Sequence, residues 1–173
     1  MKQADIYPMP EYFDRYINLA DDVELNEALQ ISRDELDILP MDLWKSIGDK
    51  VYAPGKWTIR DILQHMIDTE RIFAYRALCF ARGETARMPS FDEEEYGRNT
   101  SANQRSLEEL ITELKLVRET SIMLYSSFTD EMLLRSGLSF RGSYSVLAIG
   151  FIMVGHQRWH FNIIEERYAG LAE

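Results

Sequence analysis

Apolar residues recur at helical spacing along almost the whole chain, and the alternating pattern typical of strands is nearly absent. Four long segments carry this spacing, and we expect helices over about 22–39, 58–82, 106–128 and 145–168. Helices of roughly 18 to 24 residues are about 27 to 36 Å long, which suits a four-helix bundle. The pattern therefore predicts an all-α fold with a single domain over residues 1–173.

Polar residues mark where these helices begin. Asp21 and Glu24 have the spacing of a capping box, so the first helix is expected to open at Asp21 or the residue after it. Thr58 is expected to cap the second helix, and Ser106 with Glu109 forms a further box before the third. A serine at 143 or 145 is expected to cap the fourth.

Shorter elements are expected between and before the long helices. Residues 1–20 carry two prolines and several aromatic residues, which predicts an arm with a short helix packed on the body. Short turns are expected over 42–47 and from 129 onward, and residues 137–142 are expected to form a loop. The connection between the second and third helices is long, so simple up-and-down winding is not required.

The fourth predicted helix is apolar on nearly every side in its first half, from Val146 to Val154. A helix of this kind is buried on more than one side. We therefore expect the chain to form a homodimer through helices of this type. No stretch is long and apolar enough to cross a bilayer, so no membrane association is expected.

Charge and cysteine content exclude some classes of protein. The formal net charge is −10 and no Lys/Arg cluster is present, so we expect no nucleic-acid partner. The acidic run Asp92 to Glu95 is interpreted as a solvated turn or the first turn of a short helix. The single cysteine, Cys79, and the absence of a basic-then-apolar N-terminal segment predict a cytoplasmic location. Cys79 is expected to be a small buried residue rather than a nucleophile.

The chain has only three histidines, and their positions are the main chemical signal. His156 and His160 are four residues apart on the fourth predicted helix, so both imidazoles lie on one face. His65 lies in the middle of the second predicted helix. If the two helices pack side by side, three imidazoles converge, and three histidines with an open position commonly hold a catalytic divalent metal.

An explanation without metal is also open. A lone histidine on an apolar face is more often buried and hydrogen-bonded than a ligand, and that applies to His65 taken by itself. The pair four residues apart favours the metal hypothesis, although H-x-x-x-H is a short pattern. We predict no organic cofactor.

Neighbouring polar residues on the second helix are candidates to assist such a site. Asp61 and Asp68 lie about one turn to either side of His65, where a carboxylate can orient an imidazole or accept a proton. Equally, Asp61 can simply favour the helix N-terminus and Asp68 can face solvent. Arg76 is expected to be buried with Glu70 or Asp68 as a partner, as a structural pair first and an anion-binding group second.

Several segments together resemble the DinB/YfiT-like superfamily of metal-binding four-helix bundles. The resemblance extends over nearly the whole chain and keeps the family's order and spacing. It is carried by Tyr16-Ile17, by residues 53–58 leading into His65, by residues 68–78, by Gly155-His156 with His160, and by residues 166–168.

This resemblance implies a bundle with up-down-down-up topology and one divalent ion, usually nickel, zinc or iron, at His65, His156 and His160. It also implies a small-molecule substrate. Characterised members include S-transferases that use a low-molecular-weight thiol, a thiol-dependent isomerase, and proteins described as metal-dependent hydrolases. The expected function is thus a thiol-dependent S-transferase acting on a small electrophile. Hydrolysis by metal-bound hydroxide, or non-enzymatic binding of a ligand or metal, are the alternatives.

The chain departs from the common family pattern next to the first paired ligand. Relatives often have Gly-His-Glu-x-His-His, whereas Gln157 and Trp159 stand at two of those positions here. The two ligand positions are kept, so metal binding is still expected. A role for an acid directly after the first ligand is not, and the bulky Trp159 is expected to reshape the substrate pocket.

Overall fold

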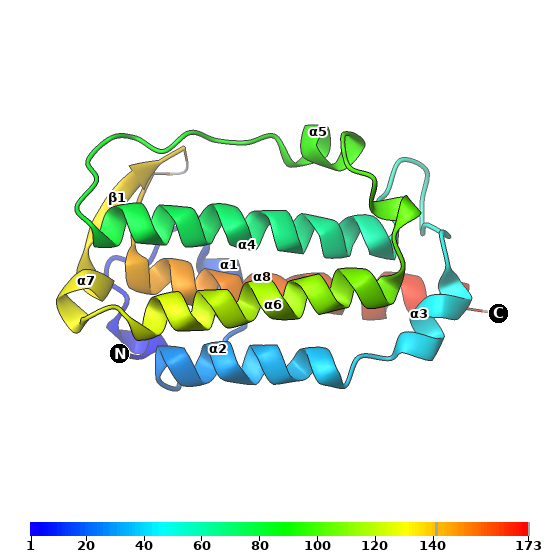
Figure 1. Cartoon of the computed structure of the whole chain (residues 1–173), viewed down its shortest axis with the longest axis horizontal. Helices are drawn as coiled ribbons and strands as arrows, with labels where there is room; N and C mark the ends of the chain where they lie inside the picture. Colours follow the sequence, from blue (N-terminus) through cyan, green and yellow to red (C-terminus); the bar gives the residue numbers. More distant parts are fainter. Residues whose placement is uncertain (141, 173) are drawn as a thin grey trace.

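Four long helices form a bundle in the computed structural model, which describes every residue except 141 and 173. They are α2 (Leu25–Asp34), α4 (Ile59–Ala81), α6 (Leu107–Ser126) and α8 (Val146–Tyr168). In Figure 1, α2 and α8 run in one direction along the bundle and α4 and α6 run in the other. The topology is therefore up-down-down-up, as the family resemblance implies.

Short elements complete the chain between these helices. In chain order they are η1 (Gln3–Asp5), α1 (Asp14–Ile17), η2 (Glu35–Asp37), α3 (Met41–Ile47), α5 (Glu93–Arg98), η3 (Ala102–Gln104), α7 (Asp130–Leu134), β1 (Ser136–Ser139), β2 (Gly142–Ser145) and η4 (Ala169–Leu171). The segment from α4 to α6 carries α5 and runs back along the whole bundle (Figure 1), because two consecutive parallel helices need a connection of that length.

The predicted caps of three long helices are confirmed. Thr58 Oγ1 accepts a hydrogen bond from the Asp61 amide at 3.1 Å, and Asp61 Oδ2 accepts one from the Thr58 amide at 2.9 Å. Ser106 and Glu109 form the same reciprocal box before α6. Ser145 Oγ accepts from the amide three residues ahead at the start of α8. Each cap satisfies backbone donors that a helix start leaves without partners.

The predicted start and end of the first long helix are wrong. α2 begins at Leu25 and ends at Asp34, followed by a single 3-10 turn. The expected capping box is absent because both acids have distant partners. Asp21 accepts a hydrogen bond from Arg158 Nη2 at 2.6 Å, and Glu24 forms an ion pair with the N-terminal ammonium.

A β-hairpin replaces most of the loop expected over residues 137–142. β1 and β2 pair antiparallel, with Ser136 opposite Ser145 and Gly137 opposite Tyr144. Residue 141 of that predicted loop lies outside the described residues. Gly137 lets the strand lie directly on Phe80 at the end of α4, since a Cβ there would come within 2.0 Å of that ring. A Gly- and Ser-rich segment this short carries no alternating signal.

The apolar surface of α8 is covered within the monomer. Every residue from Val146 to Gln157 is buried, and α8 packs against α1, α2 and α4. The burial that led us to expect a homodimer is thus satisfied inside one chain. The homodimer remains a prediction, but the burial of α8 no longer supports it.

A buried polar layer separates the core into two apolar clusters, one around each end of the bundle. At its centre, Arg118 Nε and Nη2 donate to the two oxygens of Glu70 at 2.8 and 2.9 Å. Arg118 also donates to Ser32 Oγ, and both members of the ion pair are almost fully buried. The expected partnership of Glu70 with Arg76 is therefore wrong, because α6 supplies the guanidinium instead.

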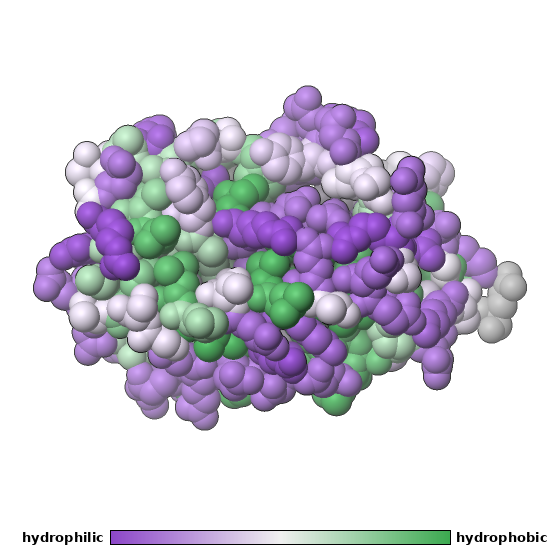
Figure 2. Space-filling model, viewed as in Figure 1, coloured by the Kyte–Doolittle hydropathy of each residue, from purple (hydrophilic) through white to green (hydrophobic). Residues whose placement is uncertain are grey.

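Polar and charged residues cover most of the face shown in Figure 2, with small apolar areas between them. None of the described helices combines the length and the apolar character that a membrane span requires.

Candidate metal centre

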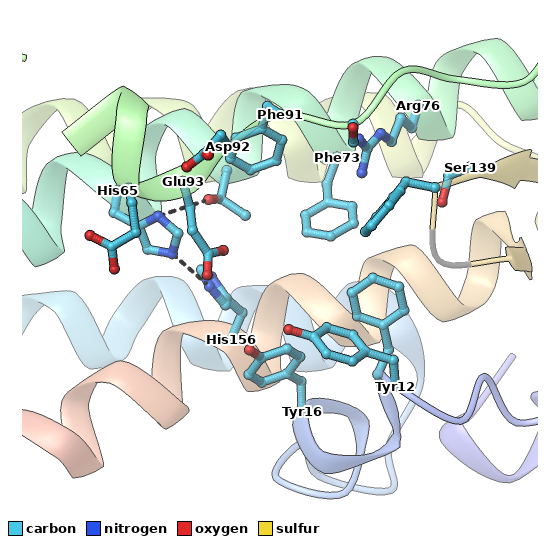
Figure 3. Close-up of a pocket in the computed structure, with 15 residues that line it drawn as sticks. Tyr12, Tyr16, His65, Phe73, Arg76, Phe91, Asp92, Glu93, Ser139 and His156 are labelled. Carbon is cyan, nitrogen blue, oxygen red and sulfur yellow. Dashed lines mark hydrogen bonds between the residues drawn. The ribbon is translucent and has the colours of Figure 1, made fainter. Parts of the chain in front are cut away.

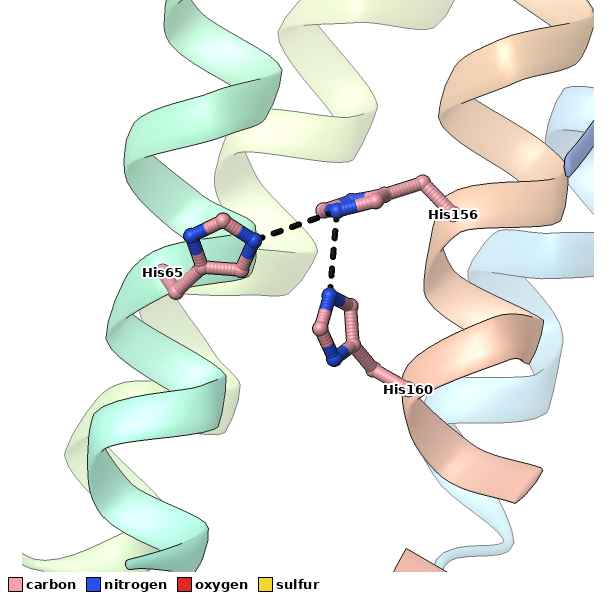
Figure 4. Close-up of side chains that lie close together, drawn as sticks. All are labelled: His65, His156 and His160. Carbon is pink, nitrogen blue, oxygen red and sulfur yellow. Dashed lines mark hydrogen bonds between the residues drawn. The ribbon is translucent and has the colours of Figure 1, made fainter. Parts of the chain in front are cut away.

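Three histidines from two helices meet beside the buried polar layer. His65 projects from α4, and His156 and His160 project from α8 one turn apart (Figure 4). His156 Nε2 lies 3.2 Å from His65 Nε2 and 3.0 Å from His160 Nε2. Nitrogen atoms of the three rings all lie within 4.8 Å of one another. The convergence expected from the sequence is present.

This geometry fits a metal ion. Zinc-to-imidazole bonds of about 2.0–2.1 Å at tetrahedral angles put ligand nitrogens roughly 3.3 Å apart. The two shortest nitrogen separations, 3.2 and 3.0 Å, are close to that value. Three ring nitrogens aimed at one point have no way to satisfy all their lone pairs among themselves, whereas a single cation accepts all three. The donor set therefore suits a divalent ion held by imidazoles.

Lowered pKa values keep the three histidines in the neutral form that binds a metal. Burial lowers the pKa of His65 to about 4 and that of His160 to about 3. For His160, repulsion from a protonated His65 adds to the effect of burial. Burial also lowers the pKa of His156 well below its usual range, reinforced by the two other histidines and by Arg118. All three are neutral at pH 7, and only a neutral imidazole offers a lone pair to a metal.

Thr69 supports one ligand from one turn along α4. Its Oγ1 lies 3.5 Å from His65 Nδ1, so the ring can donate there while Nε2 faces the other histidines. The two expected helpers have other contacts. Asp61 serves the helix cap and accepts from Asn103, and Asp68 accepts from Gln64 at 2.9 Å. Helical spacing already puts Thr69 on the same side of the helix as His65, and the structure brings this hydroxyl, rather than a carboxylate, to the ring.

A pocket of about 440 Å³ opens onto the histidines. His65 and His156 line one end of it, and Arg76 and Ser139 lie toward the other (Figure 3). Its remaining walls come from the N-terminal arm, from α4, from the segment before and within α5, and from the hairpin: Tyr12, Phe13, Tyr16, Thr69, Phe73, Ser90, Phe91, Asp92, Glu93, Glu94 and Phe140. The volume is that of a small-molecule site.

The acidic run for which the sequence predicts a solvated turn or the first turn of a short helix contributes three residues to the pocket. Asp92, Glu93 and Glu94 are exposed, but they line the pocket, and Glu93 and Asp92 lie at the histidine end (Figure 3). The run begins a helix as expected, since Asp92 Oδ1 accepts from the Glu95 amide. Its position over the site follows from the path of the long connection, which periodicity does not predict.

Tyr16 of α1 forms part of the wall beside His156. The two rings meet edge to face with centroids 5.3 Å apart, and burial raises the pKa of Tyr16 to about 12, so the hydroxyl keeps its proton at neutral pH. Gly155 makes this contact possible because a Cβ there would lie 1.7 Å from the Tyr16 carbonyl oxygen. Only a residue without a side chain permits that approach.

The residues that depart from the family pattern have defined contacts. Gln157 donates to the Ser32 carbonyl at 2.7 Å and to Glu35 at 3.1 Å, so it links α8 to α2 away from the ion position. Trp159 meets Tyr16 edge to face at 5.5 Å. Trp57, just before the cap of α4, has its ring centroid 4.8 Å from that of His65.

Comparisons with known proteins agree with this architecture. A family model described as the DinB superfamily matches residues 14–164. The fold is similar to the solved structure of YfiT from Bacillus subtilis, described as a probable metal-dependent hydrolase with an unusual four-helix bundle topology. That similarity has a TM-score of 0.67 at 17% sequence identity and covers 91% of this chain and 86% of the other. A search of curated protein sequences gave no match.

Proposed function

This chain belongs to the DinB superfamily, and from that membership and the three-histidine site we propose that it is a metal-dependent enzyme acting on a small molecule. The leading reaction is transfer of a low-molecular-weight thiol to a small electrophile. One divalent ion at His65, His156 and His160 is the proposed cofactor. Nickel, zinc and iron all suit imidazole ligands, so its identity depends on geometry and supply.

One observation supports the proposal above others: neutral imidazole nitrogens converge at the wall of a pocket large enough for a substrate. A purely structural metal would be enclosed by protein ligands. Here two of the three histidines line an open pocket, which also supports an enzyme over a simple binding bundle.

The chemistry follows from what a divalent ion supplies when bound, a lowered pKa for a thiol or a water in contact with it. In the transfer reaction the sulfur–carbon bond forms, the bond from carbon to the leaving group breaks, and the thiol proton leaves to solvent. Tyr12 and Tyr16 flank the reacting end (Figure 3), and the protonated Tyr16 is suited to hydrogen-bond the leaving group. The aromatic residues of the pocket offer an apolar surface to the substrate.

Hydrolysis is the second candidate, and the carboxylates of Asp92 and Glu93 at the histidine end of the pocket favour it. A carboxylate there can accept a proton from an attacking water. YfiT, the structural relative, is also described as a probable metal-dependent hydrolase. Glu93→Gln should then reduce ester or amide hydrolysis strongly while leaving thiol transfer largely intact.

Metal content provides the first test. Untagged protein is expected to hold one divalent ion per chain, and His156→Ala and His160→Ala are expected to lose it while keeping helical circular dichroism. Asn162→Ala, an exposed position on the same helix, is the matched control and should retain the ion. Full retention by both histidine variants, measured by elemental analysis, would remove the proposed site.

Turnover assays separate the reactions. The metal-loaded protein is compared on a panel of electrophiles with several low-molecular-weight thiols, and on esters and amides without thiol. Thiol-dependent turnover that disappears in His160→Ala supports the transferase. Turnover without thiol supports the hydrolase, and no turnover in either panel supports a binding role.

A cytoplasmic location remains part of the proposal, supported by the single cysteine.

A further inference from the structure

Arg76 is a buried cation at the end of the pocket away from the histidines. It follows His65 by eleven residues on α4, which is close to three full turns, so both lie on one face about 16 Å apart along the helix axis. Its side chain is 6% exposed and lines the pocket. Figure 3 shows it beside Ser139, with His65 at the opposite end.

No carboxylate among the described residues forms an ion pair with Arg76. Its guanidinium donates to two neutral acceptors, the Pro89 carbonyl at 2.7 Å and the Tyr144 hydroxyl at 3.4 Å. The rings of Phe73 and Phe91 lie 5.5 and 6.0 Å from it. Arginine stays charged when buried and has five N–H donors, so a charge and at least part of its donor fork remain without a counterpart.

Arg118, the other deeply buried arginine among the described residues, has a carboxylate as its partner. Arg118 is bound by both oxygens of Glu70, and the pair satisfies itself inside the bundle. Of the three acidic residues that line the pocket, Asp92 and Glu93 lie at the histidine end rather than beside Arg76 (Figure 3), and Glu94 forms no ion pair with Arg76. The pocket therefore has carboxylates at the proposed metal site and, at the far end, a guanidinium with no acidic partner in the part of the chain that the structure describes.

We propose that Arg76 binds the carboxylate of the substrate, whose reactive end lies at the three histidines. The position of the reactive end rests on the proposed function, whereas the carboxylate contact does not. A planar fork of N–H donors matches a carboxylate. Phe13, Phe73 and Phe91 line the pocket, and Phe73 lies between its two ends in Figure 3, so the substrate is an elongated molecule with an apolar middle.

The test uses ω-mercaptoalkanoic acids of six to eleven carbons and the ω-mercaptoalcohols of equal length. Affinity for cobalt-loaded protein is read from the thiolate-to-cobalt absorption band. One chain length of acid is expected to bind at least about tenfold more tightly than its alcohol, the worth of a hydrogen-bonded charge. Arg76→Gln should bring that ratio close to one. Arg71→Gln, an exposed position on the same helix, should leave it unchanged.

Equal affinities of acid and alcohol at every length in the unaltered protein would overturn the proposal, even if Arg76→Gln does not fold. If no thiol changes the cobalt spectrum, the proposed thiol-transfer reaction fails instead. Phenylalkanoates and phenylalkanols titrated into metal-free protein by calorimetry then decide the carboxylate contact alone. Preference for the acid that Arg76→Gln removes supports it, and no preference contradicts it.

Discussion

At the scale of single residues, the three histidines combine burial with neutrality. Folding removes His65, His156 and His160 from water, which lowers each pKa from about 6.5. The unfolded chain keeps the ordinary values, so it binds protons over a pH range in which the folded chain does not. Burying these rings together therefore lowers the free energy of unfolding at mildly acidic pH.

The free energy of unfolding should fall as the pH is lowered, because the unfolded chain binds more protons than the folded chain. The stability that the neutral histidines contribute is fully present above about pH 6.5, the pKa of histidine in the unfolded chain. It is lost as the pH falls toward about 4 and 3, the pKa values of His65 and His160 in the folded chain. In metal-free protein, His160 alone should lower the free energy of unfolding by about 2 kcal/mol between pH 7 and pH 5. Urea titrations at both pH values should show a smaller loss for His160→Gln than for the unaltered protein. An equal loss in both would contradict the prediction.

The buried Glu70–Arg118 pair makes a second prediction at this scale. Glu70→Gln leaves the Arg118 charge without a counterpart in a site that is 1% exposed, which should cost about 3–5 kcal/mol. Replacing both residues by leucine should recover much of that loss. Glu119→Gln, which removes one of several exposed partners of Arg33, is the control and should cost less than about 1 kcal/mol. Urea denaturation measures all three, and a Glu70→Gln loss no larger than the control would refute it.

At the scale of elements, the site depends on how closely α1 approaches α8. Gly155 permits the contact, and Tyr16 carries it to the edge of the His156 ring. The long connection contributes from the opposite side, where α5 packs against α4 and carries the acidic run. Two short helices with little stability of their own therefore form much of the pocket wall.

Gly155→Ala should displace α1 from the bundle. The added Cβ would overlap the Tyr16 carbonyl oxygen, a backbone atom that has no rotamer with which to move aside. Overpacking of this kind should cost about 1–3 kcal/mol. Gly170→Ala, whose Cβ meets nothing within 4 Å, is the matched control and should change stability by less than about 0.5 kcal/mol.

Thermal unfolding and limited proteolysis of residues 1–20 measure the effect of Gly155→Ala. Both should show a loosened N-terminal arm relative to the control. Unchanged melting and cleavage would show that α1 does not depend on this glycine.

At the scale of the whole molecule, a bound ion would join α4 to α8. A ligand that binds only the folded state, at 100 times its dissociation constant, stabilises it by about 2.7 kcal/mol. For a chain of this size that corresponds to a rise in melting temperature of roughly 5–11 °C. Differential scanning calorimetry with and without the ion checks it. His65→Ala should show no rise, and an equal rise in that variant would place the ion elsewhere.

The sequence by itself determined the caps of three long helices and the face that two of the histidines share. Thr58, Ser106 and Ser145 cap their helices through bonds within one turn, and helical spacing puts His156 and His160 on one face. These features are local, so the residues present are sufficient to predict them. The family resemblance then supplied the topology, which periodicity alone left open.

Only the tertiary structure decided the partners that lie far apart in the chain. Asp21 pairs with Arg158 instead of capping a helix, and Glu70 pairs with Arg118 instead of Arg76. The acidic run beginning at Asp92 comes to line the pocket because the connection before α6 must return along the bundle. A charged side chain takes the partner that packing brings within reach, and no local pattern records which one that is.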